Sequence, residues 1–218
     1  MVKLPKNFWL IAPFATWMAL MTVLPATAGS YAVRTAVVAA LLVAAGWWRK
    51  GPETLDVRRE PGLPSNVSSP LTSFVFRLKS SLLPGLVVGL AVFAIWILPE
   101  QFDWAWYRRF CIIGEGGTQA VAEASTLMIV YRLIGSAFVI SVAEELFFRK
   151  WLISFAGFWP MVALFAVEHD RWLVAAICGV AYGWLYLRRG LSAAIVAHAT
   201  TNLVLGVWVL KTGQWQFW

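Results

Sequence analysis

The sequence predicts an all-α fold, a polytopic transmembrane helical bundle with about seven spans. Of its 218 residues, 60% are hydrophobic and only 13% are charged, whereas an ordinary soluble domain has about 25% charged residues. Apolar runs long enough to cross a membrane as helices recur from one end of the chain to the other. Many of the fourteen Trp residues stand at the ends of these runs, where an interfacial aromatic belt would place them.

The first apolar run follows Lys3 and Lys6 and precedes Ala26-Thr27-Ala28, a pattern that resembles a signal-peptide cleavage site. Because the run is long and the rest of the chain is equally apolar, we interpret it as a retained span. The spans are expected at residues 8–25, 31–48, 81–98, 127–148, 150–168, 171–188 and 191–210.

The region between Ile134 and Phe158 has an alternative interpretation. It is also compatible with one helix that carries its charges near the middle of the membrane, followed by a short half-helix before His169. The expected number of spans is therefore six to eight. We divide the chain into N-terminal membrane helices over 1–126 and a second group of helices over 127–218.

Two polar stretches interrupt the apolar pattern. Residues 49–80 contain six basic residues and four prolines and are interpreted as a cytoplasmic loop whose last part, from Ser69, lies along the membrane as an amphipathic segment. Residues 99–126 are interpreted as a loop with an aromatic interfacial piece.

The net charge of +7 does not indicate nucleic-acid binding, because the basic residues cluster in loops between apolar runs. With seven spans, the basic residues at the N-terminus, in the 49–80 loop and at the later helix ends all fall on one side. This distribution predicts a cytoplasmic N-terminus and an outside C-terminus.

The apolar C-terminal half contains three clusters of ionisable or polar residues. A charge at the bilayer centre costs on the order of 3 kcal/mol, so each cluster is a functional hypothesis. Glu144, Glu145 and Arg149 form the first cluster. Glu145 and Arg149 share a helix face and are expected to pair, whereas Glu144 points about 100° away. A cytoplasmic helix end is the alternative interpretation of these charges.

The second cluster has Phe165 and His169 four residues apart, with Glu168 and Asp170 beside the His. Taken alone, this cluster is better interpreted as a short polar turn between two spans, with His169 exposed to water. The third cluster has His198 and Asn202 on one helix face, near Thr201, and its polar groups are also typical of hydrogen bonds between membrane helices. Both histidines of the chain lie in these clusters, so we predict that the clusters converge on one buried polar site.

The two cysteines give no disulfide framework, and Cys178 is interpreted as a packing residue. No Ser or Cys has an evident partner base, which disfavours a covalent mechanism.

The order E-E-x-x-x-R at 144–149, F-x-x-x-H at 165–169 and H-x-x-x-N at 198–202 resembles the three motifs of the CAAX prenyl protease and bacteriocin-processing (Abi, CPBP) membrane proteins. The resemblance covers about residues 127–210. The run from Glu168 to the C-terminus is similar to CAAX protease-related proteins that accompany bacterial exosortase (PEP-CTERM) sorting systems. The sequence departs from the family pattern in two ways. The interval between Arg149 and Phe165 is short, and Lys150 stands where the family usually has Gly.

This resemblance implies an intramembrane endopeptidase of the bacterial inner membrane that cleaves a membrane-anchored protein substrate in the lipid bilayer. In that scheme Glu144 deprotonates a water held between it and His169, while Glu145 and Arg149 hold the helix. His198 and Asn202 would donate hydrogen bonds to the oxyanion.

No cofactor is expected in this mechanism. A zinc ion held by Glu144, His169 and His198 is the mechanistic alternative. The functional alternatives are a non-catalytic immunity or scaffold protein of the same fold and a small transporter with a polar site at the midplane.

Overall fold

The structure is a computed structural model that describes residues 7–25, 27–46, 70–113 and 126–217. Every regular element in these ranges is a helix, which confirms the all-α prediction. The N-terminal helices are α1 (Phe8–Val23), α2 (Ala28–Ala45), α4 (Pro70–Gln101) and α5 (Ala105–Cys111).

One long helix follows, composed of α6 (Thr126–Ile134), a π-helical stretch (Gly135–Ile140), α7 (Ser141–Glu144), a second π-helical stretch (Glu145–Leu152) and α8 (Ile153–Ala156). The chain then forms α9 (Phe158–Val167), α10 (Trp172–Arg189), α11 (Leu191–Thr212) and a short 3₁₀ turn (Trp215–Phe217).

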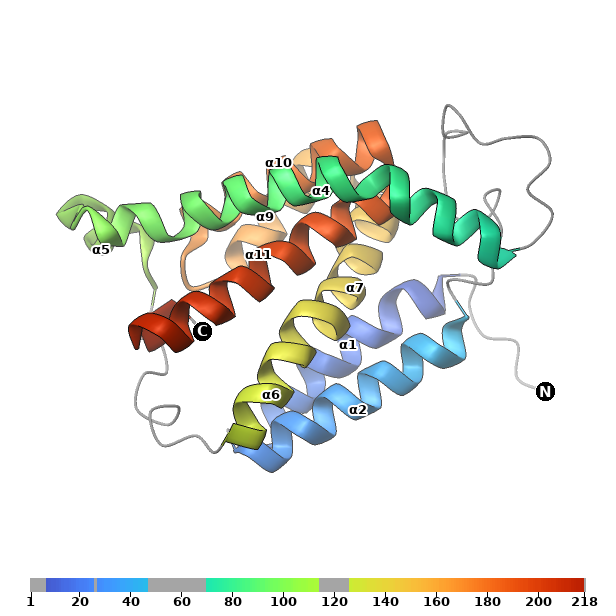
Figure 1. Ribbon diagram of the computed structural model, residues 1–218, viewed down its shortest axis with the longest axis horizontal. Coiled ribbons are helices and arrows are strands. Elements are labelled where there is room, and N and C mark those ends of the chain that lie inside the picture. The colour runs from blue at the N-terminus through green and yellow to red at the C-terminus, as the bar shows by residue number, and fades with distance from the viewer. Residues whose placement is uncertain (1–6, 26, 47–69, 114–125, 218) are drawn as a thin grey trace.

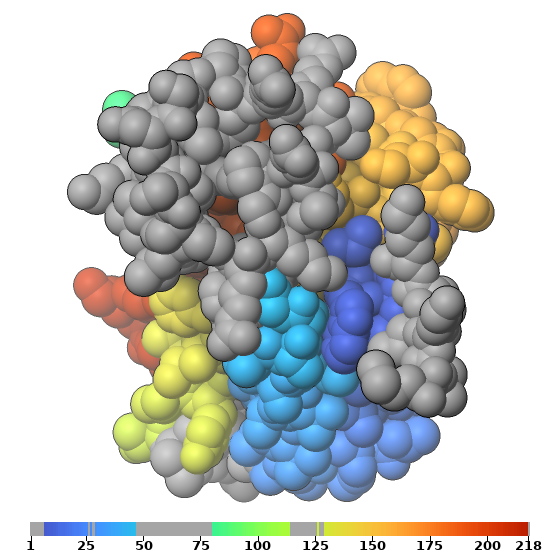
Figure 2. Space-filling view, turned by 90° about the vertical axis from the view of Figure 1, so that its right-hand side faces the viewer, coloured from blue at the N-terminus to red at the C-terminus, as the bar shows by residue number. Residues whose placement is uncertain are grey.

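The long helix separates two groups of helices (Figure 1). The antiparallel pair α1 and α2 packs on one side of it, and α11, with α4, α9 and α10, packs on the other. Figure 2 shows α1 and α2 (blue) as part of the molecular surface. Exposed side chains on these two helices include Met21, Val33, Val37 and Val43. These apolar side chains suit a lipid-facing surface.

Two helical segments are long and apolar enough to cross a membrane, Ser80–Gln101 in α4 and Leu191–Thr212 in α11. The helices α1, α2 and α9 are apolar but shorter. This test does not confirm the predicted count of seven spans.

The predicted break between spans near Arg149 is wrong. The long helix continues to Ala156 and turns at Gly157, whose φ of 97° is strained for other residues. Arg149 is fully buried against Glu145, so its charge has no need to reach the headgroups. The helix α9 that follows has only ten residues, and the alternative of one helix followed by a half-helix is therefore confirmed.

The predicted cytoplasmic loop also differs from the structure at its end. The helix α4 begins at Pro70, so the segment expected along the membrane surface is continuous with a spanning helix. Residues 47–69 of that loop, and 114–125 of the second polar stretch, lie outside the described residues.

Close packing of α4 against α11 is made possible by two glycines four residues apart. A Cβ on Gly85 would lie 2.5 Å from Val196, and one on Gly89 would lie 2.5 Å from the carbonyl oxygen of Ala197. Thr201 uses this proximity to donate a hydrogen bond of 2.9 Å to the Gly89 carbonyl. Small residues of this spacing are a common helix-packing device in membranes, and here they fix the helix that carries His198.

Candidate active site

One half of the buried polar site is an ion network that we call the paired cluster: Glu145, Arg149 and His198. Oε1 of Glu145 lies 3.1 Å from Nη1 of Arg149 and accepts a hydrogen bond of 2.8 Å from Nδ1 of His198. Both Glu145 and Arg149 are completely buried. The guanidinium also lies 4.2 Å from the ring centroid of Phe165, a cation–π contact. The predicted Glu145–Arg149 pair is confirmed.

The ring of His198 is held in one orientation. A carboxylate only accepts, so Nδ1 carries the hydrogen toward Glu145, and Nε2 faces Glu144 at 3.8 Å from its Oε2. Tyr182 stacks on the imidazole at 5.0 Å between centroids and donates a 2.6 Å hydrogen bond to Thr201. Thr201 is itself bonded to α4, so three helices orient this imidazole.

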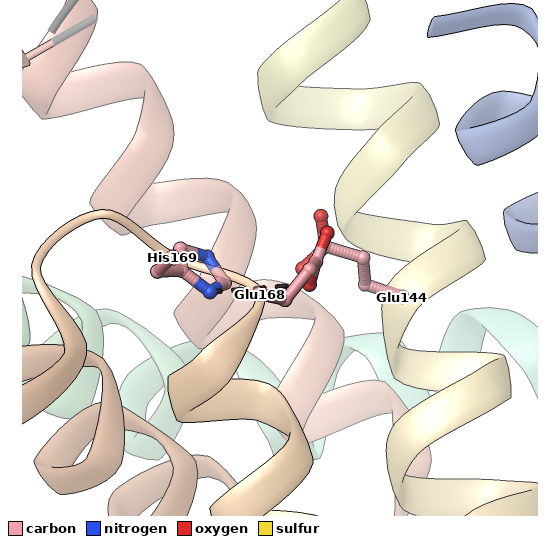
Figure 3. Close-up of side chains that lie close together, drawn as sticks. All are labelled: Glu144, Glu168 and His169. Atoms are coloured by element: carbon pink, nitrogen blue, oxygen red, sulfur yellow. Dashed lines mark ion pairs between the residues drawn. The ribbon is translucent and has the colours of Figure 1, made fainter. Parts of the chain in front are cut away.

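The other half of the site is the unpaired cluster: Glu144, Glu168 and His169. One possible ligand atom from each residue lies within 4.8 Å of the others, and Figure 3 shows the two carboxylates converging beside the imidazole. Oε2 of Glu144 and Oε2 of Glu168 are buried without a hydrogen-bond partner among the described residues. Oε2 of Glu145 is also without a hydrogen-bond partner, but Oε1 of Glu145 contacts both Arg149 and His198, and this pairing distinguishes it from Glu144.

His169 lies in the turn between α9 and α10, which α4 and α5 hold in place. Arg171 donates from Nε to Glu100 at 2.5 Å, and the amide of Ile113 donates to the Asp170 carbonyl at 2.7 Å. Nδ1 of His169 lies 2.7 Å from the carbonyl oxygen of Phe165. Because a carbonyl only accepts, Nδ1 carries the hydrogen and Nε2 keeps its lone pair. The F-x-x-x-H spacing thus gives the ring a fixed tautomer.

The two clusters meet at a cavity of about 170 Å³. A single water needs about 10–15 Å³ of such volume, so the cavity has room for several waters or part of a peptide. Glu144, His169, His198 and Asn202 all line it, as predicted, while Glu145 and Arg149 lie behind them. The other lining residues are Trp96, Ser136, Phe165, Cys178, Tyr182, Thr201, Leu205 and Phe217.

Asn202 uses its amide hydrogens to join two helices. Its Nδ2 donates to the carbonyl oxygen of Ser136 at 3.0 Å and to Oγ of Ser141 at 3.2 Å. Hydrogen bonding between helices, one of the two interpretations of this residue, is therefore present. Its role toward an oxyanion stays a prediction.

The comparison with known families concerns the part of the chain that carries both clusters. Residues 125–204 match the family described as Rce1-like, type II CAAX prenyl endopeptidase Rce1-like. This region, rather more than a third of the chain, is thus similar to CAAX prenyl proteases. All three motifs of the sequence lie inside the matched residues. No curated protein and no solved structure matches the chain.

Glu168, Trp96 and Phe217 are among the residues of the site that were not predicted as site residues. Glu168 stands directly before His169 in an apolar run, and the cost of a charge there was a reason to include it. Trp96 and Phe217 line the cavity from α4 and the 3₁₀ turn, and no local pattern marks them. Glu144, Glu168 and His169 are grouped donors that could hold a metal, and the zinc alternative expected from the sequence, with His198 in place of Glu168, stays a prediction.

Proposed function

We propose that the protein is an intramembrane endopeptidase in which Glu144 activates a water molecule for attack on a peptide bond of a membrane-associated protein. The observation that carries this proposal is the meeting of Glu144, His169, His198 and Asn202 at one cavity. The match of residues 125–204 to a protease family supports protease activity. The geometry of the four side chains supports a role for each of them.

Water activation is the role that suits Glu144 and His169. The side chain of Glu144 is 9% exposed, and its Oε2 has no hydrogen-bond partner. Nε2 of His169 has a lone pair because Nδ1 is bonded to Phe165. A water between these two acceptors can donate one hydrogen to each, and proton transfer to Glu144 would then produce the nucleophile.

Oxyanion stabilisation is the role that suits His198. Glu145 fixes Nδ1, and Nε2 faces the cavity near Glu144. Because Nδ1 carries the hydrogen toward Glu145, Nε2 can donate to an oxyanion when the ring carries a second hydrogen. A donor of this kind is worth several kcal/mol in a site without bulk water. Asn202 is proposed as the second donor.

The cellular setting is proposed on the resemblance of residues 168–218 to exosortase-associated proteins and on the distribution of the basic residues. We propose a multi-pass protein of the bacterial inner membrane with a cytoplasmic N-terminus. Its substrate would be an exported protein with a membrane anchor, processed alongside an exosortase. The apolar lining from Trp96, Leu205 and Phe217 suits a hydrophobic peptide segment.

Replacing Glu144 by Gln tests the proposal. The purified protein, in detergent, would be incubated with quenched fluorescent peptides that end in an apolar anchor. The wild type is expected to cleave at least one of them, and Glu144→Gln should lower the rate by about 10²–10⁴-fold with an unchanged melting temperature. Asp170→Asn is the matched control, because Asp170 is an exposed acid in the turn that carries His169.

A genetic experiment separates the protease from the immunity or scaffold alternative. If cells that carry only the Glu144→Gln protein keep the phenotype of the wild type, the endopeptidase proposal is wrong. The polar residues would then serve mainly to join helices, as Asn202 does through its hydrogen bonds to the long helix.

A further inference from the structure

The cavity has an apolar wall beside its polar groups. Trp96, Leu205 and Phe217 form this wall, from α4, α11 and the 3₁₀ turn. All three lie outside residues 125–204, which match the Rce1-like family. The chain therefore combines the polar groups of the matched region with an apolar wall that the match does not include.

The position of the wall along α11 relates it to the proposed chemistry. His198, Asn202 and Leu205 line the cavity from one face of this helix. Leu205 is three residues beyond Asn202, which is about 4.5 Å along the helix axis. An extended peptide advances about 3.5 Å per residue. For a peptide that lies along α11, the side chain that reaches the wall therefore belongs to a residue one or two positions from the cleaved bond.

Trp96 connects the wall to the histidine that we propose for water activation. Its ring meets the ring of His169 edge to face, with 5.8 Å between centroids. On its other side Trp96 packs against an apolar cluster that contains Leu205 and Phe217. A substrate side chain against this wall would thus lie next to the reacting groups.

Phe217 is fixed by the segments around it. The guanidinium carbon of Arg171 lies 5.0 Å from the centroid of its ring, and Arg171 is itself bonded to Glu100 at 2.5 Å. Gln101 donates a 2.7 Å hydrogen bond to Gln214, whose carbonyl oxygen accepts from the Phe217 amide at 3.3 Å. Phe217 is only 5% exposed. A ring packed this closely cannot move aside without a cost, so it can limit the size of its neighbour.

We propose that Phe217 is a specificity-determining residue, which restricts the substrate side chain beside the cleaved bond to aliphatic residues no larger than leucine. Burial against the apolar wall favours an aliphatic side chain. The cavity of about 170 Å³ must also hold the attacking water and the peptide bond, so an aromatic side chain would overlap the Phe217 ring. This inference rests on the proposed function, since it describes how the same cavity selects its substrate.

A competition assay tests the inference. The cleaved bond is first located by mass spectrometry in a peptide that the wild type cleaves, and the residues on each side of it are then varied. A leucine peptide and a phenylalanine peptide compete in one mixture, so the product ratio gives the ratio of their kcat/KM values. The wild type should prefer the leucine peptide at least tenfold, and Phe217→Ala should reduce this preference at least tenfold.

The product ratio separates specificity from a structural role. A Phe217 side chain that only stabilises the fold would, when removed, lower both rates and leave the ratio unchanged. Phe138→Ala is the matched control, because Phe138 is 56% exposed and does not line the cavity. This control should keep the wild-type ratio.

Three results would overturn the inference. They are an unchanged ratio in Phe217→Ala, a wild type that prefers the phenylalanine peptide, and the same change of ratio in Phe138→Ala. If Phe217→Ala does not fold, Phe217→Leu takes its place, because it keeps an apolar side chain, and an unchanged ratio then has the same meaning. Absence of any cleavage by the wild type would overturn the proposed function and this inference with it, whereas cleavage with an unchanged ratio overturns the inference alone.

Discussion

The paired and unpaired clusters differ in what surrounds a buried carboxylate, although Glu145 and Glu144 are neighbours in the chain. Glu145 lies beside a guanidinium, and Glu144 lies beside a second carboxylate. Glu145 is fully buried with a guanidinium and an imidazole as partners. Glu144 is nearly as buried and lies close to a second carboxylate, that of Glu168. The difference shows that burial alone does not mark a reactive group. A buried charge beside an opposite charge stabilises the fold, and one without such a partner is available to water or substrate.

The largest expected effect on stability is in the paired cluster. Arg149→Met leaves Glu145 buried without its cation, so we expect a loss of about 3–5 kcal/mol in the free energy of unfolding. Glu144→Gln should change it little, because no hydrogen bond to Oε2 is lost. Unfolding in detergent, followed by circular dichroism, measures both variants.

The double variant Glu145→Gln/Arg149→Met sharpens this test. Removing both charges should restore a large part of the stability, since neither is left unpaired. Equal losses for Arg149→Met and Glu144→Gln would show that the two clusters do not differ as described.

The next effect concerns the packing of α4 on α11, the helix that carries His198 of the paired cluster. Gly89→Ala places a methyl group 2.5 Å from the Ala197 carbonyl oxygen, and we expect a loss of about 1–3 kcal/mol from this overpacking. Gly29→Ala is the matched control, because no atom lies within 4 Å of the added Cβ. Melting temperatures of the two variants are compared in the same detergent, and an equal change would argue against close packing of α4 on α11.

A smaller loss is expected from Tyr182→Phe. The variant loses the 2.6 Å hydrogen bond to Thr201, a loss of about 1 kcal/mol. Thr201 keeps its bond to the Gly89 carbonyl, so the helices should stay in place. Chemical denaturation measures the change, and a loss as large as that of Arg149→Met would mean that the hydroxyl does more than orient His198.

The smallest effect is expected at an exposed ion pair outside both clusters. Asp103 pairs with Arg108 on the surface, where their side chains are 72% and 50% exposed. Asp103→Asn should cost about 0.5 kcal/mol or less, because water screens the pair. Asn also tolerates the positive φ of 53° at this position. A large loss of stability on denaturation would contradict the distinction between exposed and buried pairs.

The sequence by itself determined the helical class, the Glu145–Arg149 pair and the residues of the three motifs. The class follows from composition, since the apolar runs exclude an ordinary soluble core. The pair follows from helical geometry, since residues four apart share a face. These features depend on neighbours in the chain, which a sequence displays directly.

Only the tertiary structure decided which groups stay without partners. It placed the turn at Gly157 instead of Arg149, brought Glu168 to Glu144 and committed the amide hydrogens of Asn202 to the long helix. It also brought Trp96 and Phe217 to the cavity from distant segments. The partners of a buried polar group are set by the packing of helices far apart in sequence, and spacing along one helix carries no information about that packing.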